Sequence, residues 1–110
     1  HLQAIHGISA TEIYVVGFNG DVIRYNGSAW ELVETATDSY LHGVWGVSGS
    51  DLFVVGHPLF VPDESAFHYN GSTWQKVPPG PYTAFNGVWG PSATDVYAVT
   101  NFGVLKFKGI

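Results

Sequence analysis

The sequence predicts an all-β fold made of repeated units of four antiparallel strands, and three observations predict it. Three copies of one pattern begin at Leu2, Leu41 and Phe85, which gives a period of about 40–45 residues. Each copy contains short runs rich in β-branched and aromatic residues. Asn-Gly pairs, which favour tight hairpins, follow such runs in the first two copies. A repeat of this length with four strands is typical of a β-propeller blade.

The second copy shows four strands, A to D, which are expected over residues 43–47, 52–56, 66–69 and 73–77. The first copy contains the same strands, whereas the third reaches only strand C. A Greek-key sandwich would contain similar strands but would not need such similar units. Residues 1–110 are therefore expected to form a partial β-propeller with two full blades and a three-stranded third. The expected boundaries are about 2–40, about 41–84 and about 85–110.

Composition excludes several classes of protein. Lys and Arg number 4 against 9 Asp and Glu, and the formal net charge of -5 argues against a nucleic-acid partner. The absence of Cys excludes disulfides and thiol chemistry, and no apolar run approaches the ~20 residues of a membrane span. The sequence lacks hydrolase, zinc-protease and phosphate-loop motifs, and its histidines lack metal-ligand spacing. We therefore expect a protein that is not an enzyme, with no cofactor and no metal.

Residues 41–56 read L-H-G-V-W-G-V-S-G-S-D-L-F-V-V-G, and Y-N-G-S-T-W follows at 69–74. This pattern resembles the repeat of bacterial secreted or surface-anchored β-propeller proteins. Residues 2–30 match it with His6 in place of Trp, and residues 85–109 match it as far as they extend. The turn between strands C and D also resembles a degenerate Asp-box, a structural turn of sialidase-type propellers, without its aspartate. The resemblance implies the propeller fold and a secreted or cell-surface location, and it implies no catalysis.

Four tryptophans recur at fixed places in the repeat and are expected to build the blades. Trp45 and Trp89 lie on the innermost strands, where we expect them to pack between neighbouring blades. Trp30 and Trp74 open the outer strands, where we expect them to cover the turn between strands C and D. The alternative for an exposed Trp is a stacking surface for sugars.

An acidic residue also recurs at the start of strand B, as Glu12, Asp51 and Asp95. A carboxylate at this place is expected to accept backbone N–H bonds in the preceding turn. The alternative, a ring of metal-binding carboxylates, would need a second acid nearby in each copy. On strand C the aligned residues Arg24, His68 and Lys106 are expected to be polar surface.

The loops that differ between the copies mark the expected binding site. In a blade the D–A and B–C loops emerge on one rim, and function is expected on varied loops over a fixed scaffold. The B–C loop is lengthened to residues 57–65 in the second copy, compared with 18–20 in the first. A polar and aromatic pocket for a sugar or a short peptide is expected there, unless these are plain solvated loops. Its candidate residues are Tyr40, His42, His57, Asp63, Tyr82 and Asn86.

A closed propeller has about four to eight blades, more than this chain provides. An open set of blades would expose its apolar inter-blade faces. The chain is therefore expected either to be a piece of a longer propeller or to associate, most simply as a homodimer that closes a six-bladed ring. The expected function is a non-catalytic module that binds a carbohydrate, as a lectin does, or a peptide or protein. The alternatives are a self-assembling structural fragment without a ligand and a piece of a propeller hydrolase whose catalytic residues are missing.

Overall fold

The computed structural model describes residues 2–33, 35, 39–57, 66–77, 84–92, 94–100 and 103–107. These residues form three antiparallel sheets, each a meander in which strands adjacent in sequence are also adjacent in space. The predicted all-β fold with four-stranded antiparallel units is confirmed. Within the described segments, no helix reaches the length and apolarity that crossing a membrane requires.

The three sheets are called blades 1, 2 and 3 from here on. Blade 1 consists of β1 (Leu2–Ser9), β2 (Glu12–Gly17), β3 (Val22–Tyr25) and β4 (Trp30–Val33), with a short 3-10 turn, η1 (Phe18–Gly20), between β2 and β3. Blade 2 consists of β5 (Tyr40–Ser48), β6 (Asp51–His57), β7 (Ala66–Tyr69) and β8 (Trp74–Lys76). Blade 3 consists of β9 (Phe85–Ser92), β10 (Asp95–Thr100) and β11 (Val104–Phe107).

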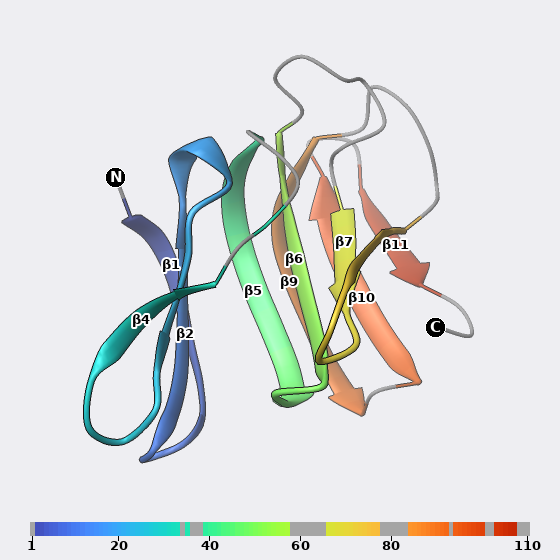
Figure 1. Cartoon of the computed structure of the whole chain (residues 1–110). Helices are drawn as coiled ribbons and strands as arrows, with labels where there is room; N and C mark the ends of the chain where they lie inside the picture. Colours follow the sequence, from blue (N-terminus) through green and yellow to red (C-terminus); the bar gives the residue numbers. More distant parts are fainter. Residues whose placement is uncertain are drawn as a thin grey trace.

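Blade 2 lies between the other two blades, so the three sheets are stacked in a row (Figure 1). The first strands of the blades lie side by side: β5 of blade 2 contacts β1 of blade 1 and β9 of blade 3. These backbones approach closely, because a Cβ atom added at Gly43 would lie 3.0 Å from the Cα atom of Gly87. The glycines of the repeated pattern therefore allow the innermost strands of neighbouring blades to pack together.

Side chains on both faces of blade 2 form the core. Along β6, Leu52 and Val54 belong to the cluster shared with blade 1, whereas Phe53 and Val55 belong to the cluster shared with blade 3. Successive side chains of a strand point to opposite faces. This strand is covered on both sides, which explains its uninterrupted apolar sequence.

The expected tight hairpin between strands C and D uses its asparagine and its glycine in different ways. In blade 2 only Gly71 has positive φ, at 99°, whereas the Asn70 side chain accepts bonds from the backbone N–H groups of Ser72 and Thr73, each at 2.9 Å. An Asn-Gly pair with both residues left-handed occurs instead in η1, where Asn19 has φ of 61° and Gly20 of 71°. The asparagine of the repeat is thus a side-chain acceptor rather than a left-handed residue.

Candidate functional site

The rim that carries the B–C and D–A loops gathers four aromatic and imidazole side chains. Tyr40 begins β5 and pairs in register with His57 at the end of β6. His42 lies two residues further along β5, and Phe18 follows β2 in the neighbouring blade. We call Phe18, Tyr40, His42 and His57 the rim cluster.

Phe18 holds this cluster together across the boundary between blades 1 and 2. Its ring stacks on Tyr40 with 4.5 Å between centroids and an interplanar angle of 28°. It also meets the His42 ring edge-on, at 6.4 Å and 89°. Both separations fall within or near the range in which aromatic pairs attract. The rings of Phe18, Tyr40 and His42 are only half-buried, so they form a rigid surface that remains accessible.

His42 is held in its neutral form more strongly than a free histidine. Its pKa is lowered, first because burial disfavours the charged imidazolium and second because of the charge of nearby His57. A neutral imidazole offers one donor and one acceptor nitrogen. The rim cluster therefore combines apolar ring faces with hydrogen-bonding groups that suit an uncharged polar partner.

Of the remaining predicted site residues, only Asn86 is described, and it lies exposed on β9 of blade 3. Asp63 and Tyr82 lie outside the described residues. Phe18 was not predicted from the sequence as a site residue. It stands immediately before the tight Asn19-Gly20 turn, and this position in the sequence indicates a side chain that lies at a loop.

The four repeated tryptophans differ in environment. Trp45 is 6% exposed and packs in the cluster between blades 2 and 3. Trp89, at the equivalent place in blade 3, is 63% exposed, contrary to the expectation that it packs between blades. The described residues place no further blade against its side of blade 3. Trp30 and Trp74 lie beside tyrosines of the C–D turns, and Trp30 is largely exposed whereas Trp74 is half-buried.

The repeated acids of strand B pair with the bases of strand C. Asp51 lies 2.6 Å from His68, and Asp95 lies 2.8 Å from Lys106. The Lys106 ammonium lowers the pKa of the Asp95 carboxyl, chiefly through this hydrogen bond. The expectation that His68 is surface is wrong, because it is buried against Phe53. The pairs link adjacent strands, and among the described residues no group of three His, Asp or Glu side chains could hold a metal.

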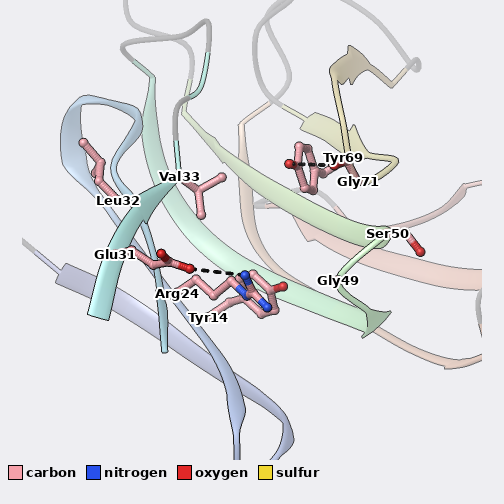
Figure 2. A pocket seen from close by; sticks show the side chains of 9 residues that line it. All are labelled: Tyr14, Arg24, Glu31, Leu32, Val33, Gly49, Ser50, Tyr69 and Gly71. Carbon is pink, nitrogen blue, oxygen red and sulfur yellow. Dashed lines mark hydrogen bonds and ion pairs between the residues drawn. The ribbon is translucent and has the colours of Figure 1, made fainter. Parts of the chain in front are cut away.

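A hollow of about 570 Å³ lies on the opposite rim, between β4 of blade 1 and the turns of blade 2 (Figure 2). Arg24 points into it and donates to Glu31 at 3.2 Å, and its other amino group lies 4.0 Å from Glu12. This arginine is already shared by two carboxylates. The hollow is lined by residues of the repeated turns, namely Gly49, Ser50, Tyr69 and Gly71. It therefore belongs to the scaffold that the copies share, unlike the rim cluster.

Comparison with known proteins supports the fold. No protein-family model matches the chain, and no match to a curated protein is found. The structure is similar to a solved β-propeller structure described as YCF48 bound to D1 peptide, with a TM-score of 0.74 and 18% sequence identity. The similarity covers 97% of this chain and 37% of that chain. The chain thus consists of β-propeller blades and spans little more than a third of the propeller it matches.

Proposed function

We propose that this chain is a non-catalytic β-propeller module that binds an extended peptide segment through the rim cluster. One observation carries the proposal: accessible aromatic rings and imidazoles converge on the rim whose loops differ between the copies. Rigid aromatic side chains supply contact area at a low cost in conformational entropy. Varied loops beside them are where recognition is expected on a repeated scaffold.

The chemistry of the cluster indicates the kind of peptide. The stacked rings of Phe18 and Tyr40 suit an apolar or aromatic side chain, and the neutral His42 suits a backbone amide or an uncharged polar group. The similar structure, described as bound to D1 peptide, supports a peptide as the ligand class. A lectin-like module is the second candidate, because aromatic faces with hydrogen-bonding neighbours also suit a sugar.

Selection of a displayed random peptide library against the chain, with a glycan array in parallel, tests this proposal. We expect a peptide to be recovered, and Tyr40→Ala and His42→Ala each to weaken its binding at least tenfold by isothermal titration calorimetry. Gln75→Ala, an exposed change on β8, is the matched control and should leave affinity unchanged. Circular dichroism verifies that each variant is folded.

Three outcomes would contradict the proposal. Peptide binding that survives both rim changes would place the site elsewhere. Binding of a glycan with no peptide recovered would favour the lectin-like function. Hydrolysis of a glycan or peptide by the wild-type chain would contradict the non-catalytic assignment.

A further inference from the structure

Exposed apolar side chains gather on the two outermost blade faces. The blade 1 open face carries Leu2, Ile5, Trp30 and Leu32, all more than half exposed. Register pairing places Ile5, Val15, Ile23 and Leu32 in one row across this sheet. The blade 3 open face carries Trp89, Val99 and Val104, which are also exposed. Such patches mark surfaces that contact another molecule.

The repeat shows what these faces are built to contact. Trp89 and Val99 occupy the places that Trp45 and Val55 occupy in blade 2, and both of those residues are buried against blade 3. Val104 pairs with Val99 as Ala66 pairs with Val55, and Ala66 is fully buried. The blade 3 open face is therefore the type of surface that packs against the following blade.

The blade 1 open face is the opposite type of surface. Leu2 and Ile5 occupy the places of Leu41 and Val44, and both of those residues are buried in the cluster that joins blade 2 to the preceding blade. Each open face thus matches one side of an interface that already exists within the chain. The two faces are complementary to each other, but blade 2 stands between them (Figure 1).

We infer that a second copy of this chain covers these faces, with blade 3 of each copy packed on blade 1 of the other. The contact is head-to-tail, and it forms twice when the two copies are related by a two-fold axis. Six blades then close a ring, a number within the range of about four to eight that propellers use. This inference does not depend on the rim cluster, which lies at the loops rather than on the open faces.

The contact between blades 1 and 2 indicates how the new interface is made. The His6 ring nitrogen Nε2 lies 2.8 Å from the Gly46 carbonyl oxygen across that boundary. His6 and Trp89 occupy the same place in the repeat, and Gly7 occupies the place of Gly46. The Trp89 indole N–H is therefore placed to donate to the Gly7 carbonyl oxygen of the second copy. Gly87 occupies the place of Gly43, and among the described residues a Cβ there would meet only Val99, at 3.6 Å. This open space would receive the innermost strand of the second copy.

Light scattering coupled to size exclusion, over about 1–100 μM protein, tests the inference. The wild-type chain should elute at twice the 11.9-kDa mass of one chain. Val99→Arg should raise the dimer dissociation constant at least tenfold, because the charge falls in the apolar interface. Val47→Arg is the matched control: Val47 is 44% exposed and Val99 42%, but Val47 lies in blade 2.

Ile5→Arg tests the other side of the same interface and remains informative if Val99→Arg does not fold. It should also produce monomers, because Ile5 is 67% exposed on the blade 1 open face. A wild-type chain that is a folded monomer at 100 μM would overturn the inference. Larger open assemblies would refute the closed ring, and equal loss of association in Val47→Arg would refute the assigned faces.

Discussion

Alkaline pH should destabilise the protein through Tyr14, and Tyr14→Phe should remove this sensitivity. Tyr14 is 2% exposed, and its hydroxyl donates to the Glu12 carboxylate at 2.9 Å. Its pKa is raised from 10.0 to about 12, first by burial and second by the Glu12 carboxylate, which stabilises the protonated phenol. The nearby Arg24 opposes the effect but does not outweigh it.

The sign and magnitude follow from linkage between protonation and folding. Below pH 10 the Tyr14 hydroxyl is protonated in both the folded and the unfolded chain. As the pH rises from 10 to about 12, the unfolded chain loses its proton first, so the free energy of unfolding falls. Each pKa unit corresponds to about 1.4 kcal/mol, so ionisation of Tyr14 should lower the free energy of unfolding by about 3 kcal/mol between pH 10 and about pH 12.

The repeat supplies the reason to choose phenylalanine. Phe53 occupies the same place in blade 2 with 1% exposure, so a Phe ring is compatible with this environment. At pH 8 the substitution should cost about 1 kcal/mol or less, because Glu12 keeps contact with solvent and with Arg24. Between pH 8 and pH 12 the wild type should then lose about 3 kcal/mol more than Tyr14→Phe.

Urea unfolding followed by tryptophan fluorescence at fixed protein concentration, in steps from pH 8 to pH 12, measures this difference. The difference in phenolate absorbance between the wild type and Tyr14→Phe isolates the ionisation of Tyr14 from that of the other tyrosines among the six. Equal loss of stability in the wild type and in Tyr14→Phe would refute the reasoning, because the loss would then come from other groups.

Two further changes test the packing of the blades. Trp45→Ala should lower the free energy of unfolding by about 3–5 kcal/mol, since it empties a buried site between blades 2 and 3; a loss below about 1 kcal/mol in urea unfolding would contradict this packing. Gly56→Ala should abolish or strongly weaken cooperative unfolding, because its Cβ would overlap the Tyr40 carbonyl oxygen and lie 2.8 Å from the Leu41 Cα atom. Cooperative unfolding of Gly56→Ala with a free energy of unfolding close to that of the wild type would argue against the close approach of β5 and β6.

The sequence predicted the strands well because each blade repeats a local pattern. The apolar run 52–55 and the turns around it occur in the other copies, so propensity and repetition agree on the same strands. The type of turn was predicted less well. The Asn70-Gly71 pair predicted a tight hairpin, but not that only Gly71 is left-handed while the Asn70 side chain bonds two backbone N–H groups; a sequence pattern does not distinguish these two uses of asparagine.

The candidate site was only partly predictable. The varied loops predicted that Tyr40, His42 and His57 lie together at one rim, but not that a residue from another blade contacts them. Phe18 is distant in sequence from β5, and only the packing of blade 1 against blade 2 brings its ring to 4.5 Å from Tyr40. Interactions between blades depend on how whole sheets stack, which local propensity does not encode.

A comparison of Trp45 with Trp89 shows what the sequence determined and what only the tertiary structure decided. Both residues stand in the same G-V-W-G segment, and the sequence by itself determined that both lie on the innermost strand of a propeller blade. Their exposures, 6% and 63%, were decided by whether another blade lies against them. Strand formation follows from local side chains and turns, whereas burial requires a partner surface, and within the described part of this chain only blade 2 has one on each side.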